Sequence, residues 1–312
     1  MDKYPMAKSP VTCRTRRDPL VPHWSLWPLL SMAPLAQTLA LLAMAMATTA
    51  VDVIPLDMAL DSFDDQYQDC GTKMMAELSA LNHSEFQQNP LFAQAWLNAT
   101  AVWRGQKCPV PSLSSPAQAI ALMAYTMDEL YREFNAAVRV AGRSRQEYRD
   151  NFHFKTLHFL LTQALVTLRQ AQNGQCHNVS RGVRMYKFKA KPGDIVRFGQ
   201  FSSASESEKT AKRFGSATMF QVYTCHGAAI WNFSKYPGEK EVLIPPFETF
   251  KVVEVSQEGD SAWIQLWSNG TFSKYNCEWL QGDVTGGSIP RAPFHLGGLL
   301  ATTTLAAATG IL

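Results

Sequence analysis

The hydrophobic period of the chain changes near residue 175, and this change limits the folds that the chain can adopt. Before this point, apolar residues recur at helical spacing, most clearly in "FKTLHFLLTQALVTLRQAQNG" (154–174). After it, short β-branched or aromatic runs alternate with Gly, Pro and Asn/Asp turns. Helices followed by strands indicate an α+β fold, with a helical part over residues 60–173 and a β-rich part over 176–280.

The helical part contains three clear helix signals. Ser115 before Pro116 is a cap followed by a proline that needs no N–H in the first turn. The segment "ELYREFNAAVRVAG" (129–142) repeats apolar residues on one side and stops at Gly142, and Asn173-Gly174 ends the longest periodic run. The apolar face of that run consists of Leu157, Leu160, Leu161, Ala164, Leu165 and Leu168.

The β-rich part contains no phosphate-binding glycine loop. Neither GxGxxG nor a Walker sequence occurs, so a nucleotide bound here is not held in a Rossmann or P-loop manner. The expected strands are "DIVRFGQFSSAS" (194–205), "ATMFQVYTC" (217–225), "EVLIPP" (241–246), "ETFKVVEV" (248–255) and "AWIQLWS" (262–268).

The two ends of the chain resemble targeting signals. Residues 1–50 combine a basic lead, an apolar stretch at 35–46 that is too short to span a bilayer, and small residues, which predicts a signal peptide with an extended leader. Translation starts either at Met1 or at Met32. Residues 281–312 run from small residues through a polar spacer to an apolar tail, which matches a GPI-attachment signal with the anchored residue at 282–288. The alternative is an apolar tail on a secreted protein, so we expect a protein of the secretory pathway that is anchored at the cell surface or secreted.

Between these ends the chain is close to neutral. Residues 51–290 hold 23 Lys/Arg and 24 Asp/Glu, a net charge of −1, whereas the whole chain has +3. No basic patch remains to indicate a nucleic-acid partner.

Cysteines and sequons agree with an oxidising compartment. Cys13 lies in the leader, and the spacing of the other five cysteines is unlike a paired CxxC zinc site, so we expect disulfides and no metal. Asn-x-Ser/Thr sequons, which are candidate glycosylation sites, occur at Asn82, Asn98, Asn178, Asn232 and Asn269.

Two glutamates at the mouth of an expected strand, in "GEKEVLIPP" (238–246), are the first sign of chemistry. Alternate residues of a strand share a face, so Glu239 and Glu241 are expected on one side. Carboxylates this close repel each other unless a cation lies between them. The alternative interpretation is a solvated strand end.

With Arg181 in "VSRGVRMYKF" and Ser203 in "RFGQFSSAS", this pair resembles the R-S-ExE signature of the arginine-specific mono-ADP-ribosyltransferases, the vertebrate ecto-enzymes related to bacterial toxins. The resemblance runs from about residue 55 to 280, the expected catalytic domain being 51–280. It includes "LDMALDSFDDQYQDC" (56–70), "EFNAAVRVAGRSRQEY" (133–148), "FHFKTLHFLLTQAL" (152–165), "EVLIPPFETFKV" (241–252) and "YNC" (275–277).

The resemblance implies the ADP-ribosyltransferase fold, with a mostly antiparallel sheet and a cleft for NAD. It also implies transfer of one ADP-ribose from NAD to arginine side chains of extracellular or surface proteins, with release of nicotinamide. It implies that Glu241 binds the ribose 2′-hydroxyl and stabilises an oxocarbenium-like cation, which wants a nearby carboxylate. By the same resemblance, Glu239 receives the acceptor guanidinium, Tyr236 contacts the acceptor, Arg181 pairs with the pyrophosphate and Ser203 holds the ribose.

The same resemblance pairs Cys70 with Cys277 and Cys176 with Cys225, leaving Cys108 over. His153 and His158 are interpreted as packing or hydrogen-bonding residues. Ser180 stands where the family usually has an aromatic residue, which also completes the Asn178 sequon beside an expected catalytic strand.

Two alternatives to the transferase stay open: an NAD glycohydrolase, in which water replaces arginine, and a catalytically silent surface glycoprotein on the same fold. Relatives with another residue at the Glu239 position tend towards hydrolysis, so Glu239 favours the transferase. In every case we expect a monomer that reaches a membrane only through a GPI anchor.

Overall fold

The computed structural model describes residues 51–105, 112–128 and 130–282. The signal peptide, Cys108 and the GPI-attachment signal lie outside the described residues and stay predictions. Among the residues described, no helix is long and apolar enough to cross a bilayer.

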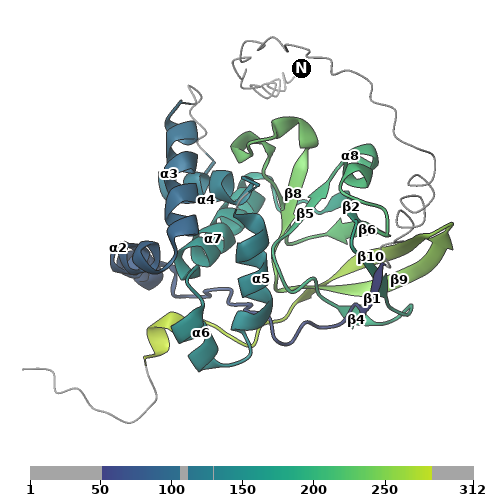
Figure 1. Cartoon of the computed structure of the whole chain (residues 1–312), viewed down its shortest axis with the longest axis horizontal. Coiled ribbons are helices and arrows are strands. Elements are labelled where there is room, and N and C mark those ends of the chain that lie inside the picture. The colour runs from purple at the N-terminus through teal and green to yellow at the C-terminus, as the bar shows by residue number, and fades with distance from the viewer. Residues whose placement is uncertain (1–50, 106–111, 129, 283–312) are drawn as a thin grey trace, which may run out of the picture. The chain divides into compact units, whose positions relative to one another are not determined.

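The helical part precedes the sheet in the chain and packs on one side of it (Figure 1). The predicted helices are confirmed: the long apolar face lies buried on α7, and the run that stops at Gly142 forms α5. Over the described residues this part consists of α2 (Gly71–Gln88), α3 (Pro90–Gly105), α4 (Pro116–Tyr125), α5 (Tyr131–Ala141), α6 (Arg145–Asn151) and α7 (Lys155–Ala171).

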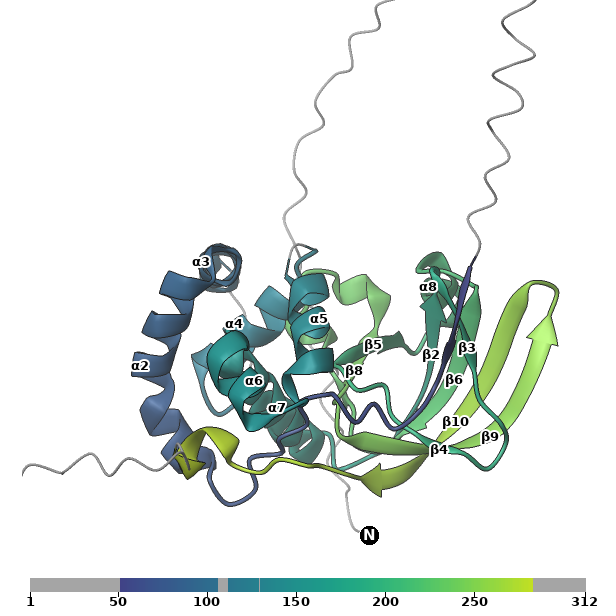
Figure 2. The ribbon, with the colours of Figure 1, turned by 60° about the horizontal axis from the view of Figure 1, so that its bottom comes forward.

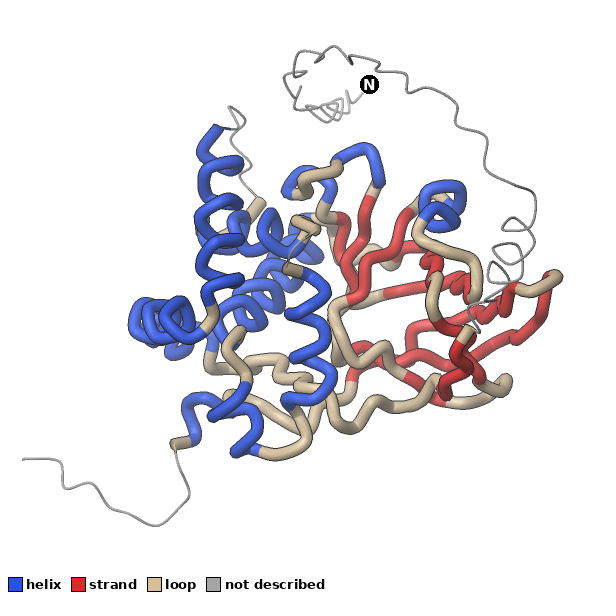
Figure 3. The backbone as a smooth tube through the Cα atoms, viewed as in Figure 1, coloured by secondary structure: helices blue, strands red, loops and turns tan. Residues whose placement is uncertain are grey.

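The β-rich part forms an eight-stranded sheet with the order β4-β9-β10-β6-β2-β5-β8-β7. Neighbouring strands are antiparallel except for β6 and β10, and β1 pairs with β3 in a separate parallel ribbon. Helices α2 to α7 lie on one side of the fold, whereas the strands and α8 lie on the other (Figure 3). The strands are β1 (Asp52–Pro55), β2 (His177–Val183), β3 (Tyr186–Lys189), β4 (Ile195–Val196), β5 (Ser202–Ser205), β6 (Thr218–Thr224), β7 (Ala228–Ala229), β8 (Glu241–Ile244), β9 (Glu248–Glu258) and β10 (Ser261–Thr271), with α8 (Glu208–Arg213) between β5 and β6.

The strands differ from the sequence-based expectation in two places. The run 194–205 contains two strands, because residues 197–201 leave the sheet through Gly199, whose φ is +62°. A side chain there would also bring its Cβ to 2.3 Å from the Cβ of Ala59. The hairpin of β9 and β10 is longer than predicted, and its tip lies on the side away from the helices (Figure 2).

Strand β8 contacts both hydrophobic cores of the fold. Val242 and Ile244 pack into the core of the sheet, whereas Leu243 packs into the helical core. This alternation follows from the two-residue period of a strand that is buried on both faces. The first residue of this doubly covered strand is Glu241.

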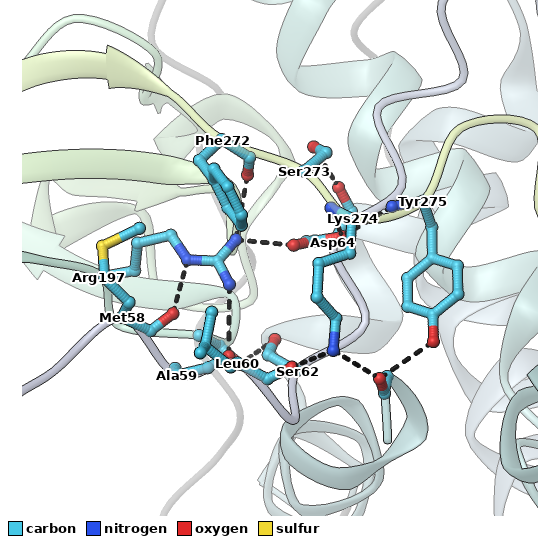
Figure 4. Close-up of polar contacts among 12 residues, drawn as sticks. Met58, Ala59, Leu60, Ser62, Asp64, Arg197, Phe272, Ser273, Lys274 and Tyr275 are labelled. Atoms are coloured by element: carbon cyan, nitrogen blue, oxygen red, sulfur yellow. Dashed lines mark hydrogen bonds and ion pairs between the residues drawn. The ribbon is translucent and has the colours of Figure 1, made fainter. Parts of the chain in front are cut away.

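A buried ion pair joins the two ends of the described chain to the sheet (Figure 4). Nη1 of Arg197 lies 2.7 Å from Oδ2 of Asp64, and both side chains are fully buried. The same guanidinium donates hydrogen bonds to the carbonyl oxygens of Met58, Ala59 and Phe272. Arg197 therefore holds the segment before α2 and the segment after β10 against the chain that leads into β5.

Two disulfides join the cysteine pairs that the resemblance implies. Cys70 is bonded to Cys277, which closes the chain between its first and last described helical segments. Cys176 is bonded to Cys225 at the start of β2. Removing a native disulfide from a secreted domain typically costs about 2–5 kcal/mol.

The Arg197 pair gives the first testable prediction. Arg197→Met leaves Asp64 buried without its partner, so the free energy of unfolding should fall by about 3–5 kcal/mol in urea denaturation. The control is Arg143→Met, because Arg143 pairs with Asp61 at 3.2 Å on an exposed surface. That change should cost less than about 1 kcal/mol. Equal losses in the two variants would contradict the role given to Arg197.

Candidate active site

The sheet brings three predicted site residues onto neighbouring strands. Arg181 lies on β2, Ser203 on β5 and Glu241 at the start of β8, and these strands are adjacent in the sheet. Ser180 pairs with Ser205 across β2 and β5, and Ser205 pairs with Glu241 across β5 and β8. Residues far apart in the sequence thus meet through strand pairing.

Arg181 is held by the strand that carries Ser203. Its Nη1 donates a hydrogen bond to the Ser203 carbonyl oxygen at 2.6 Å, and its guanidinium lies 5.9 Å from the centre of the Phe198 ring. The next residue must be glycine, because a Cβ on Gly182 would lie 2.3 Å from the backbone oxygens of Ala211 and Gly215 beside α8. In this Arg-Gly pair, Arg181 therefore supplies the cation and Gly182 lets the strand pack closely against α8.

The Ser203 hydroxyl lies between Glu241 and a buried tyrosine that the sequence analysis missed. Burial raises the pKa of Tyr125 to about 12, so the phenol keeps its proton. It donates that proton to the Phe201 carbonyl oxygen at 2.9 Å and accepts a hydrogen bond from Nδ2 of Asn135 at 3.2 Å. The Tyr125 hydroxyl oxygen lies 3.5 Å from Oγ of Ser203, and it can therefore only accept a hydrogen bond from Ser203. Nothing in the local sequence pattern identifies Tyr125, on the apolar helix α4, or Asn135, on the buried face of the amphipathic helix α5.

Glu241 is a buried carboxyl group with a raised pKa. Burial, followed by the charge of Glu239, raises its pKa from 4.5 to about 7. Hydrogen bonds from Ser203 and Ser234 and the charge of Arg181 act in the opposite direction. A buried carboxyl group that titrates near neutrality among other polar groups is a candidate for catalysis.

Glu239 corrects the expectation that both glutamates lie on one strand. It ends a short 3₁₀ turn, Pro237–Glu239, and Lys240 follows with a left-handed φ of 48°. Because this turn interrupts the strand, the two-residue alternation does not relate the side chains. They are still close enough for the charge of Glu239 to raise the pKa of Glu241. The Ser205 hydroxyl fixes the turn through a hydrogen bond to the Glu239 carbonyl oxygen at 2.6 Å.

Glu239 lies in an open and partly acidic environment. Burial, and more weakly Asp128, raise its pKa, whereas Arg213 lowers it. Tyr236 is exposed, and its hydroxyl donates a hydrogen bond to Asp128 at 2.8 Å. The backbone N–H of Lys235 bonds to Thr126 at 3.0 Å, so this turn is held against the end of α4.

Other predicted residues lie outside this cluster. His158 is buried, Nδ1 lies 2.9 Å from the Tyr67 hydroxyl and Nε2 lies 3.2 Å from the Phe63 carbonyl oxygen, as expected for a packing residue. A cavity of about 700 Å³ lies beside the site and is lined by residues 56–61, Arg139, residues 194–196 and Phe198. Phe198 connects this cavity with Arg181, but none of the four signature residues lines it. The described residues contain no cluster of His, Cys, Asp or Glu suited to a metal ion.

Comparison with known proteins identifies the family. The model of the family described as "NAD:arginine ADP-ribosyltransferase" matches residues 56–274. The chain belongs to the NAD:arginine ADP-ribosyltransferase family. Its relatives include the erythroblast NAD(P)(+)–arginine ADP-ribosyltransferase of Gallus gallus, 51% identical over 73% of this chain and 77% of that protein. The GPI-linked NAD(P)(+)–arginine ADP-ribosyltransferase 1 of Homo sapiens is 47% identical over 73% of this chain and 75% of that protein.

The fold agrees with this assignment. The crystal structure of the eukaryotic mono-ADP-ribosyltransferase ART2.2 matches with a TM-score of 0.63 at 34% identity, over 72% of this chain and 98% of that chain. A variant of ART2.2 in complex with NAD matches with a TM-score of 0.61 at 36% identity over the same shares. The chain therefore has the ADP-ribosyltransferase fold, as the sequence predicts.

The raised pKa of Glu241 predicts how stability depends on pH. Because the pKa of Glu241 is higher in the folded protein than in the unfolded chain, its carboxylate binds a proton more tightly in the folded protein. Its stabilising contribution is complete below pH 4.5 and is lost as pH rises through about 7. Urea unfolding of Glu241→Gln at pH 5 and pH 8 should therefore show a smaller loss of stability than wild type, whereas exposed Glu208→Gln should behave like wild type. An unchanged loss in Glu241→Gln would contradict this assignment.

Proposed function

We propose that this family member transfers one ADP-ribose from NAD to the guanidinium group of arginine side chains and releases nicotinamide. The observation that carries the proposal is Glu241, a buried carboxyl group with a pKa of about 7 beside Ser203 and within the field of Arg181. Departure of nicotinamide from ribose C1′ leaves an oxocarbenium-like sugar, and a desolvated carboxylate stabilises such a cation strongly.

Arg181 and Ser203 would orient the dinucleotide. The planar guanidinium of Arg181 suits the pyrophosphate oxygens, and it faces Phe198 next to Ser203. The Ser203 hydroxyl has a single proton, so it donates either to Glu241 or to the oxygen of the protonated Tyr125. Tyr125 and Asn135 thus limit the directions in which the Ser203 hydroxyl can point. The Glu241 carboxylate is then free to accept a hydrogen bond from the ribose 2′-hydroxyl.

Glu239 would take the acceptor. Its carboxylate lies in the exposed turn that precedes Glu241, next to Tyr236 and Asp128. An arginine guanidinium bound there replaces repulsion between two carboxylates with attraction. A guanidinium nitrogen attacks C1′ as the bond to nicotinamide breaks, and Glu239 accepts the proton that the guanidinium loses. The products are nicotinamide and ADP-ribosyl-arginine.

The acceptors would be arginine-containing proteins outside the cell. The two disulfides and the GPI-linked relatives support a protein that acts at the cell surface. Whether this chain is anchored or secreted depends on residues 281–312, whose expected signal can be tested by phospholipase release from intact cells.

The test uses NAD and agmatine, a small guanidine, with the purified protein. Wild type should form ADP-ribosyl-agmatine. Glu239→Gln should lose this product but still hydrolyse NAD, because water can replace the acceptor, and Glu241→Gln should lose both reactions. The loss in each affected reaction should be at least about 100-fold, in line with removal of a charged transition-state contact.

The control variant is Glu208→Gln, because Glu208 lies on α8 in an exposed pair with Lys212. It should keep both reactions. NAD hydrolysis by wild type without agmatine modification would identify an NAD glycohydrolase, and NAD binding without turnover would identify a silent surface glycoprotein.

A further inference from the structure

A partly exposed aromatic pair lies on the face of the sheet that Arg181 does not use. The rings of Tyr223 on β6 and Trp267 on β10 have centroids 4.6 Å apart, and Trp267 is 51% exposed. The two residues are direct partners in the parallel pairing of β6 with β10. Their neighbours on the same face are polar, because Gln221 and Gln265 lie two residues away on each strand. A half-exposed aromatic pair with polar neighbours offers ring surface on which a further group can pack.

A sequon lies directly beside this pair. Asn178 on β2 is the cross-strand partner of Tyr223, and it is exposed. Directly opposed residues in an antiparallel pair have Cβ atoms about 4.5–5.5 Å apart on the same face. The side chains of Asn178, Tyr223 and Trp267 therefore follow one another across three neighbouring strands.

Arg181 lies three residues after Asn178 on the same strand. Side chains at this spacing project from opposite faces. A sugar chain attached to Asn178 therefore leaves β2 on the face opposite to Arg181.

We propose that Asn178 is N-glycosylated and that the first sugars of its glycan cover the aromatic pair Tyr223–Trp267. Sugar rings carry C–H groups on one face, which pack on aromatic faces, and hydroxyl groups that remain hydrated. Neighbouring strands lie about 4.8 Å apart, so the Asn-linked sugar reaches Tyr223 and the next sugar reaches Trp267. The two disulfides place the folding of this chain in an oxidising compartment, where N-glycosylation occurs.

The first test is the occupancy of the site. The full chain is expressed in animal cells, and the tryptic peptide 170–181 is analysed by intact glycopeptide mass spectrometry. We expect an N-linked glycan on Asn178. Recovery of this peptide without a glycan would overturn the proposal.

The second test asks whether the glycan contacts the aromatic pair. Asn178→Gln removes the glycan and should lower Tm by about 2–4 °C. In a domain of this size, such a shift corresponds to a loss of about 1 kcal/mol. In the Trp267→Thr and Tyr223→Thr backgrounds, the same change should lower Tm by less than about 1 °C, because the partner is already absent. These strand positions accept Thr because it is a β-branched residue.

The control sequon is Asn98, which is exposed on α3 and has Gln94, Ala95, Ala101 and Val102 as its helical neighbours. Any effect of Asn98→Gln on Tm should be the same with Trp267 or Thr at position 267. An equal loss of Tm for Asn178→Gln in the wild-type and aromatic-variant backgrounds would show that the glycan does not contact the pair, and would leave the aromatic surface to another partner.

Discussion

The buried ion pair between Arg197 and Asp64 holds both ends of the described chain against the segment that leads into β5. The two residues lie 133 positions apart, and the Arg197 guanidinium also binds carbonyl oxygens before α2 and after β10. The chain continues from Arg197 through Phe198, which faces Arg181, to Ser203. An unpaired charge at this depth would be strongly destabilising, so the pair fixes one arrangement of these segments. The position of β5 in the active site follows from that arrangement.

The active site uses the boundary between the two hydrophobic cores. Glu241 begins a strand whose following residues are buried on both faces, and this burial is the largest cause of its raised pKa. Tyr125 extends to the same place from the helical core, and its hydroxyl oxygen can accept a hydrogen bond from Ser203. The packing that stabilises the fold thus also buries the Glu241 carboxyl group, which would stabilise the cationic sugar. Glu239, in contrast, lies in a turn open to an acceptor.

Periodicity alone predicted the α+β order and the helices α5 and α7, because both elements bury one regular apolar face. Arg181, Ser203 and Glu241 were found through a family resemblance, and strand pairing brings them together. The prediction that Glu239 lies on a strand was wrong, because Lys240 adopts a left-handed backbone conformation that the local sequence does not predict. Tyr125, Asn135 and the Arg197–Asp64 pair were missed because their partners are distant in the chain.

The proposed reaction requires NAD to bind with its scissile bond at Glu241. The most direct measurement is a crystal structure of the Glu241→Gln variant with NAD. The pyrophosphate should lie at Arg181, and the nicotinamide ribose should lie within hydrogen-bonding distance of Ser203 and residue 241. A dinucleotide whose nicotinamide ribose lies in the cavity between residues 56–61 and Phe198, away from Ser203, would contradict it.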